Sequence, residues 1–409
     1  MQIGCTNGSP IVDTLDHLPP LSLFVDYRHS RSGFTMLTEQ DELGIYHALR
    51  LHGRIRHIGL DIPPSILHKA LALMDGNFPI LENLYLPGSF SPDSGHRLPL
   101  TLPESFLAPN LQHLTLFGIS LPKRLRLLTS TVSLVTLTLR NIQTSNYFRP
   151  RLLVARLRSL PLLEELTIHF SIPIPRPSTE MELLGEKRAP ITLPSLKTLR
   201  FDGVGAYLES LVAQIRVPLL EQLYIELFNQ IAFVLPNLFY LINSTKAFRL
   251  SGARVDFYHD GVCVSIGTVH YHGLGRIPFS LYVRCNPLDW QIDCVAQICY
   301  ALIPKLSGVE KLTLLISYEE IPTEMRNGAI DSATWHDLLR IFIGVKKIDI
   351  DDALTEELSR ALHVDEVGSN PSFLPNLQSI HAKDNLFTSF IDTRQVVGRP
   401  VQFEKLRYR

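Results

Sequence analysis

The sequence has few cysteines, and they are not spaced in pairs. Its 409 residues include five cysteines, none of which belongs to a Cys-x-x-Cys motif. A disulfide framework or a zinc site requires paired or closely spaced cysteines, so this pattern argues against both. Scattered thiols are typical of a reducing compartment, and we therefore expect an intracellular protein, either cytoplasmic or nuclear.

An excess of charge of either sign is also missing. Lysine and arginine number 39 and aspartate and glutamate number 40, which leaves a formal net charge of −1. This balance gives no electrostatic reason to expect binding to nucleic acid or to an anionic membrane. We accordingly expect neither as a partner.

Long apolar runs are absent as well. The longest nearly apolar stretch, Ile231 to Ile242, is too short to span a bilayer and contains Pro236. The first residues, Met1 to Gly8, have neither the basic segment nor the apolar run of a signal peptide. Both observations predict a soluble chain without a membrane anchor.

What the sequence does contain is a short phrase that recurs along most of its length. Each copy has an apolar residue, two variable residues, a leucine or isoleucine, one variable residue and another apolar residue. Clear copies begin at Leu81, Leu111, Leu134, Leu163, Leu196, Leu220, Val309 and Val345, with weaker copies at Ile55 and Leu377. Successive copies up to Leu220 are 23 to 33 residues apart, which is typical of leucine-rich repeats with irregular turns.

The segments between these phrases have helical periodicity. They are Ser65–Met74, Arg151–Leu160, Tyr207–Ile215, Ile292–Leu302, Thr334–Phe342 and Thr355–Leu362. Strand, turn and helix repeated about a dozen times predict an α/β fold of the leucine-rich-repeat solenoid type, an irregular horseshoe like that of ribonuclease inhibitor. The usual buried asparagine ladder is absent, since its positions hold residues such as Ile119 and Ile142.

A doubly wound parallel sheet is the competing architecture, because it also alternates strands and helices. Its strands are covered on both faces and read as continuous apolar runs. The strands expected here interleave polar residues instead, as at His113 and Thr115. One open face of the sheet is therefore the better interpretation.

We divide the chain into a tail at residues 1–20, a single solenoid at 21–401 and a second tail at 402–409. Between Val255 and Ile266 the sequence predicts two strands joined through an Asp260-Gly261 turn, which is a hairpin inserted near residues 250–284. The segment Ser171–Pro190, rich in proline and charge, is expected to be an exposed loop.

Several motifs of the last third are more specific than the repeat. In order they are Asp289-Trp290-Gln291, Ala296–Cys299, Trp335–Arg340, Ala353–Leu362, Phe387–Arg394 and Gly398-Arg-Pro400. Together with Leu21–Tyr27 and the stretch from Glu39 to Asp61, they resemble the F-box/leucine-rich-repeat-like proteins of mushroom-type fungi. The resemblance covers roughly residues 21–401.

In that family an F-box precedes the repeats and docks the protein on the adaptor of a cullin–RING ubiquitin ligase, while the repeats select the target. An F-box is about forty residues of helices, and only about twenty residues precede Leu21 here. The resemblance therefore implies a non-catalytic, substrate-binding repeat region without a recognisable F-box, whose partner is a protein. The alternatives are a truncated recognition subunit of such a ligase, which would bind the adaptor through an F-box encoded upstream, and an enzyme.

In a horseshoe the residues flanking the second and third apolar positions of each phrase face the concave side. Aromatic and charged side chains there are the candidate anchors for a protein partner. The candidates are Tyr85, His113, Phe117, Arg140, His169, Arg200, Tyr224 and Glu226.

For two other groups of residues we favour an ordinary structural role over a functional one. His270 and His272, with His259, are a metal candidate or ordinary histidines on a strand surface. Gly203-Val-Gly205 is half of a dinucleotide-binding signal, or a glycine turn that uses a positive φ. We expect no catalytic group, no cofactor and no metal.

Two further groups are interpreted as structural. Asp349, Asp351 and Asp352 are expected to cap a helix that begins near Ala353, or to place a carboxylate on the concave face, rather than to bind calcium. Trp290 and Trp335 are expected in the core.

Overall fold

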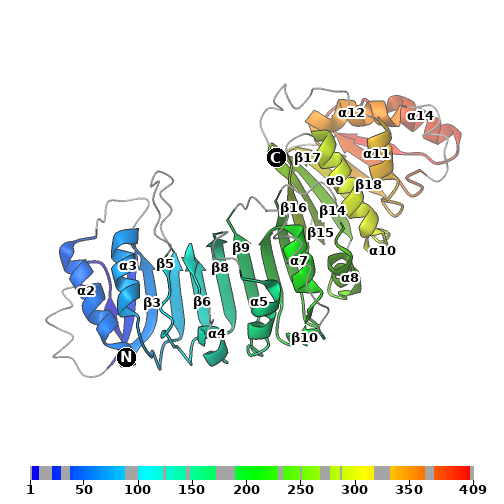
Figure 1. The fold of residues 1–409 in the computed structure, drawn as a ribbon. Coiled ribbons are helices and arrows are strands. Elements are labelled where there is room, and N and C mark those ends of the chain that lie inside the picture. The colour runs from blue at the N-terminus through cyan, green and yellow to red at the C-terminus, as the bar shows by residue number, and fades with distance from the viewer. Residues whose placement is uncertain are drawn as a thin grey trace. The chain divides into compact units, whose positions relative to one another are not determined.

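The computed structural model is a mixed α/β protein in which helices accompany a large, mainly parallel sheet (Figure 1). It describes residues 2–8, 21–28, 37–87, 100–122, 126–143, 148–171, 189–228, 234–248, 251–267, 277–285, 288–316, 332–363 and 373–405. The chain forms two compact units. Unit 1 is Met1–Gly203 with Ser210–Leu220, and unit 2 is Val204–Glu209 with Glu221–Arg409.

In unit 1, eight strands of the described residues follow one another across the sheet in chain order. They are β1 (Gln2–Cys5), β2 (Ser22–Arg28), β3 (Ile55–Asp61), β4 (Asn83–Pro87), β6 (His113–Phe117), β8 (Thr136–Ile142), β9 (Glu165–Phe170) and β11 (Thr198–Gly203). Each pair of neighbours is parallel. Two short parallel pairs flank this sheet, β5 (Leu100–Thr101) with β7 (Ile119–Ser120) and β10 (Ile191–Thr192) with β12 (Ile215–Arg216).

The helices of unit 1 lie on one side of these strands (Figure 1). They are α2 (Glu39–Arg50), the 3₁₀ helix η1 (His52–Arg54), α3 (Pro64–Leu73), α4 (Arg126–Ser130) and α5 (Pro150–Leu157), and α7 (Gly205–Val212) is shared between the units. Local sequence fixes their starts. Thr38 and Asp41 form a capping box at α2, and α3 and α5 begin with a proline, whose missing N–H is not needed there.

The second apolar position of each repeat phrase occupies the same place on successive strands. Leu84 pairs with Leu114, which pairs with Leu137, and this row continues through Leu166 and Leu199. All five side chains are buried. The predicted alternation between core and solvent is therefore confirmed for these strands, and its register is continuous from one copy of the phrase to the next.

A tight turn precedes most of these strands, and the turns form their own ladder. The backbone N–H of the first apolar residue of a phrase donates to the carbonyl three residues earlier, as Leu81 does to Phe78 and Leu163 to Leu160. Polar side chains then link one turn to the turn before it. The amide of Asn110 donates to the carbonyl of Pro79 at 2.6 Å, and the hydroxyl of Ser195 donates to that of Pro161 at 2.9 Å.

The described part of unit 2 also forms eight strands, but they are not in chain order. From one side to the other they are β13 (Gln222–Leu227), β16 (Phe279–Arg284), β15 (Gly261–Gly267), β14 (Gly252–Tyr258), β17 (Lys311–Ile316), β18 (Lys347–Ile350), β19 (Ser379–Ala382) and β20 (Gln402–Lys405). β15 is antiparallel to both neighbours, and the other pairs are parallel. The accompanying helices are α8 (Pro236–Ser244), α9 (Leu288–Ala301), α10 (Ile303–Leu306), α11 (Ser332–Leu339), α12 (Asp352–Leu362) and α14 (Thr388–Val396).

The hairpin expected in the insertion is the β14–β15 pair, but its turn differs from the prediction. Tyr258 pairs with Gly261, so the two turn residues are His259 and Asp260, and Gly261 is the first residue of β15. Neither turn residue has a positive φ. Gly261 is required for space, because a Cβ there would lie 2.3 Å from the carbonyl oxygen of Val283 in β16.

The predictions for Gly203 and for Trp290 need correction. Gly203 does not adopt a positive φ; a Cβ there would lie 2.9 Å from the rings of Phe170 and Phe201, so glycine provides room for these aromatic side chains. Trp335 is fully buried as expected and contacts Phe257 edge-on, with ring centroids 6.0 Å apart. Trp290 is 49% exposed and does not belong to the core.

The segments expected to be tails both contribute strands. Gln2–Cys5 pairs with β2, and Gln402–Lys405 pairs with β19. Most of the loop predicted at Ser171–Pro190 lies outside the described residues. The predicted helices are present within a few residues of their expected bounds, because a buried apolar stripe fixes each of them.

Candidate binding faces of the sheet

The side of the unit 1 sheet away from the buried leucines is the first candidate site. Six of the predicted residues lie on it: Tyr85, His113, Phe117, Arg140, His169 and Arg200. Their positions alternate with the buried leucines, and cross-strand pairing places them on one face. We call this surface the open face of unit 1.

Several of these side chains are held in place by a neighbour on the adjacent strand. The guanidinium of Arg140 lies 5.9 Å from the ring centroid of Phe117, which is a cation–π distance. The Nδ1 atom of His169 lies 2.8 Å from Oδ2 of Asp202. Tyr85 is 43% exposed, a large fraction for an aromatic residue in a strand. The open face of unit 1 therefore presents aromatic and charged groups in fixed positions.

Between these groups runs a row of small hydroxyl side chains. Thr115, Thr138 and Thr167 occupy paired positions on β6, β8 and β9, and all three are partly exposed. Tyr85 continues the row on β4. Threonine is a good strand former and offers a donor and an acceptor, so the centre of the face is polar.

An aromatic platform on β2 and β3 was not predicted. The rings of Phe24 and His57 are stacked, with centroids 4.0 Å apart and planes 7° from parallel. Gly59 lies beside them, and a Cβ there would be 2.8 Å from Oδ1 of Asp26 and 3.1 Å from Nε2 of His57. A glycine between two buried apolar residues, Ile58 and Leu60, was the available signal for this close approach.

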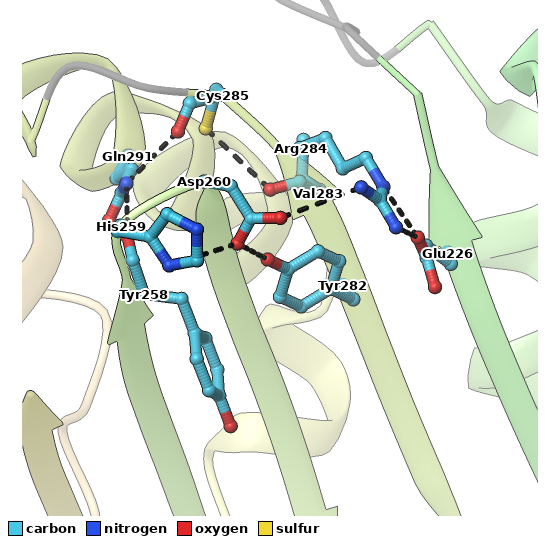
Figure 2. Close-up of polar contacts among 9 residues, drawn as sticks. All are labelled: Glu226, Tyr258, His259, Asp260, Tyr282, Val283, Arg284, Cys285 and Gln291. Atoms are coloured by element: carbon cyan, nitrogen blue, oxygen red, sulfur yellow. Dashed lines mark hydrogen bonds and ion pairs between the residues drawn. The ribbon is translucent and has the colours of Figure 1, made fainter. Parts of the chain in front are cut away.

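Unit 2 holds the other two predicted residues, Tyr224 and Glu226, on β13. The hydroxyl of Tyr224 donates to the carbonyl of Ile277 at 3.3 Å. Glu226 accepts from Nε and Nη2 of Arg284 on β16, at 2.6 and 2.5 Å (Figure 2). Glu226 is thus one partner of an ion pair within the face, and Arg284 was missed by the sequence analysis.

Arg284 also reaches the tip of the β14–β15 hairpin, where Asp260 contacts the side chains of both Tyr282 and Arg284 (Figure 2). Oδ1 of Asp260 accepts from the hydroxyl of Tyr282 at 2.5 Å, and Oδ2 lies 3.5 Å from Nη1 of Arg284. Burial and the bond to Asp260 raise the pKa of Tyr282 well above its usual range. Tyr282 is therefore a hydrogen-bond donor at neutral pH, and its hydroxyl is not a base.

A buried amide anchors the same hairpin from the helix side. Nε2 of Gln291, at the start of α9, donates to the carbonyls of Tyr258 and Cys285 at 2.8 and 2.9 Å (Figure 2). Gln291 has no exposed surface. The ends of β14 and β16 are thus tied to one helix, so the tip of the hairpin is a rigid part of the face.

A second charged group lies farther along the unit 2 sheet and centres on Asp349. Its Oδ2 is 2.6 Å from Nζ of Lys311, and its Oδ1 is 3.8 Å from Nδ1 of His381. Burial, together with the charge of Lys347, lowers the pKa of His381. Of the three aspartates weighed together, Asp349 lies on the sheet face, whereas Asp351 caps α12 by accepting from the backbone N–H of Ala353 at 3.1 Å.

The metal candidate is only partly within the described residues. His270 and His272 lie outside them, and His259 is a largely exposed turn residue whose Nδ1 lies 3.8 Å from Asp260. Among the residues with described positions, no group of three or more histidine, cysteine, aspartate or glutamate side chains is arranged to hold a metal ion. Likewise, no helix in the described part of the chain is long and apolar enough to cross a membrane.

In comparisons with known proteins, the sequence matches no family model and no curated protein.

Proposed function

We propose that this chain is a non-catalytic protein-interaction module built as a leucine-rich-repeat solenoid, and that it binds a protein partner on the open face of its sheet. The observation that supports this most directly is the difference between the two faces of the unit 1 strands. Buried leucines occupy one face, while exposed aromatic, hydroxyl and charged side chains occupy the other in continuous register. Aromatic and arginine side chains are the ones that dominate protein–protein binding energies.

The charged groups around the hairpin of unit 2 support binding rather than catalysis. Asp260 and Glu226 have cationic or hydroxyl partners at hydrogen-bond or ion-pair distance. A nucleophile or general base requires a group with a suitable pKa and an open approach. Burial and the hydrogen bond to Asp260 raise the pKa of Tyr282, which is the direction that keeps its hydroxyl protonated.

The resemblance of residues 21–401 to F-box/leucine-rich-repeat-like proteins suggests the class of activity. In that class the repeats select a protein for ubiquitination. The chain would then be the substrate-binding region of such a protein. A truncated recognition subunit of a cullin–RING ligase is the alternative, and it predicts binding to the ligase adaptor.

The test is affinity purification of the tagged chain, compared with a variant of its open face. We expect Tyr85→Ala combined with Arg140→Ala to lose at least one partner that the unaltered chain retains, as identified by mass spectrometry. The matched control is Leu43→Ala with Arg50→Ala, two exposed residues of α2 on the helix side of the same unit. If all partners are retained by the open-face variant, the proposed binding face is wrong. Recovery of the ligase adaptor and cullin with the unaltered chain and with both variants would favour the truncated ligase subunit.

A further inference from the structure

A long stretch of the chain contains no acidic residue. Between Glu104 and Glu164 lie 59 residues with no aspartate or glutamate, one lysine and seven arginines. The whole chain balances 39 basic against 40 acidic residues, so this excess of eight positive charges is a local feature. The stretch belongs to unit 1.

Most of these arginines lie on the helix side of unit 1. We define the basic helix surface by the members that the structure describes there: Arg126 of α4, and Arg149, Arg151, Arg156 and Arg158 of α5 and its flanks. The two helices are adjacent (Figure 1), and the hydroxyl of Ser159 donates to the carbonyl of Leu128 at 3.3 Å. The surface is separated from the open face by the sheet.

Three of these arginines have no acidic partner within the described residues. No carboxylate there forms an ion pair with Arg126, Arg151 or Arg158, and all three are exposed. Arginines elsewhere in the fold do form such pairs, as Arg56 does with Glu82 and Arg284 does with Glu226. The basic helix surface therefore carries positive charge that the described fold does not neutralise.

The helix geometry brings these charges together. Arg151 and Arg158 are seven residues apart, which is close to two turns, so they project from the same side of α5, about 10 Å apart along its axis. This spacing is comparable with the screening length of about 8 Å at physiological ionic strength, so the two charges reinforce one another. A ligand with several negative groups can contact both.

The surface is also partly apolar, and this narrows the class of ligand. Leu152, next to Arg151, is 45% exposed, and Val132, which follows α4, is 56% exposed. A ligand that offers only phosphates would leave these side chains uncontacted. Arginine binds carboxylates and phosphates alike through two parallel hydrogen bonds, so the exposed apolar side chains are what favour an acidic peptide.

We propose that the basic helix surface binds an acidic segment of a protein partner, in which aspartate or glutamate residues alternate with aliphatic ones. The carboxylates would pair with Arg126, Arg151 and Arg158, and an aliphatic side chain would cover Leu152. Because this surface and the open face lie on opposite sides of the unit 1 sheet, the proposal does not depend on the proposed function.

The test is the fluorescence anisotropy of a labelled synthetic peptide, rich in glutamate and with leucines at its centre, titrated with the full chain. We expect Arg151→Glu combined with Arg158→Glu to weaken binding by about tenfold or more, and Leu152→Ser alone by about threefold. The control is Arg216→Glu combined with Arg360→Glu, which makes the same charge change at exposed residues elsewhere and should alter affinity by less than about twofold. Circular dichroism of each variant verifies folding.

Three results would overturn the proposal. Equal weakening in the control variant would show that the peptide responds only to net charge. An unchanged affinity after Leu152→Ser would show that Leu152 makes no apolar contact with the peptide. Tighter binding of vesicles containing anionic phospholipid, or of duplex DNA, than of the peptide would assign the surface to a membrane or to nucleic acid.

Discussion

Glu209 caps a helix that begins 27 residues later in the chain: its Oε2 atom accepts the backbone N–H of Leu238 in the first turn of α8, at 3.1 Å. Its Oε1 atom accepts from both the backbone and side-chain nitrogens of Asn237, each at 2.6 Å. Leu235, at the N-cap of α8, has no side-chain oxygen, so a carboxylate from α7 performs the capping. The buried charge of Glu209 lies where the dipole of α8 is positive.

We expect Glu209→Ala to lower the free energy of unfolding by about 2–4 kcal/mol. The substitution removes charge-assisted hydrogen bonds and leaves buried amide groups of α8 without an acceptor. Urea denaturation monitored by circular dichroism measures the loss. The matched control is Glu356→Ala, at an exposed position of α12, which should stay within about 0.5 kcal/mol of the unaltered chain. Equal stability of the two variants would contradict the capping role.

Gly261 should not tolerate a side chain. A Cβ at this position would meet the backbone oxygen of Val283 at 2.3 Å and the hydroxyl of Tyr282 at 2.8 Å, so β15 and β16 would have to separate. We expect Gly261→Ala to destabilise the fold by about 1–3 kcal/mol. Gly53→Ala is the control, since a Cβ there meets nothing within 4 Å. A thermal melt in which both variants lose the same stability would show that the packing argument is incorrect.

Adjacent residues of β4 should lose very different amounts of stability on the same replacement. Leu84 is 1% exposed and Tyr85 is 43% exposed. Leu84→Thr leaves a cavity and buries a hydroxyl, so we expect it to cost about 2–4 kcal/mol. Tyr85→Thr places a good strand former on the open face and should cost less than about 1 kcal/mol. Equilibrium unfolding of the two variants checks the face assignment, which a larger loss for Tyr85→Thr would reverse.

His381 should make the fold sensitive to acid. Its pKa in the folded chain lies below the ordinary value of 6.5, chiefly because burial disfavours the charged ring and because Lys347 is nearby, while Asp349 and Glu404 act in the opposite direction. The unfolded chain then binds the proton more readily, so the contribution of this group is complete above pH 6.5 and is lost as the pH falls from there through the lower folded value. We expect His381→Gln to lose less stability than the unaltered chain when denaturant unfolding is compared at about pH 7 and about pH 5. Identical losses would exclude His381 as the titrating group.

The strands and most helices were predictable because local periodicity decides them. Leucines at fixed spacing in a phrase leave one arrangement that buries them, and the polar residues between them must then face solvent. Tyr85 and His113 were placed correctly on this basis. The same reasoning correctly predicted a helix cap at Asp351, because an aspartate before a helical segment satisfies amides that the helix itself cannot.

Contacts between residues that are far apart in the sequence were not predictable in this way. The roles of Gly203 and Gly261 come from rings and carbonyls on neighbouring strands, which spacing along one strand does not reveal. Trp290 was assigned to the core because its sequence neighbours are apolar, yet the helix turns it outward. The arginine-rich stretch was visible in the sequence, but its signal is the absence of acids over 59 residues, which an overall net charge of −1 conceals.

The strand order of unit 2 has a consequence for how the chain folds as it is synthesised. In unit 1 each strand of the main sheet pairs with the main-sheet strand that precedes it in the chain. The sheet can therefore be extended strand by strand as the chain leaves the ribosome. β13 pairs with β16, whose Phe279 follows Leu223 by 56 residues, and β14 and β15 are made in between. That edge of β13 must wait, unpaired, until the hairpin and β16 have emerged. Closure of this long loop should therefore be the slow step in the folding of unit 2.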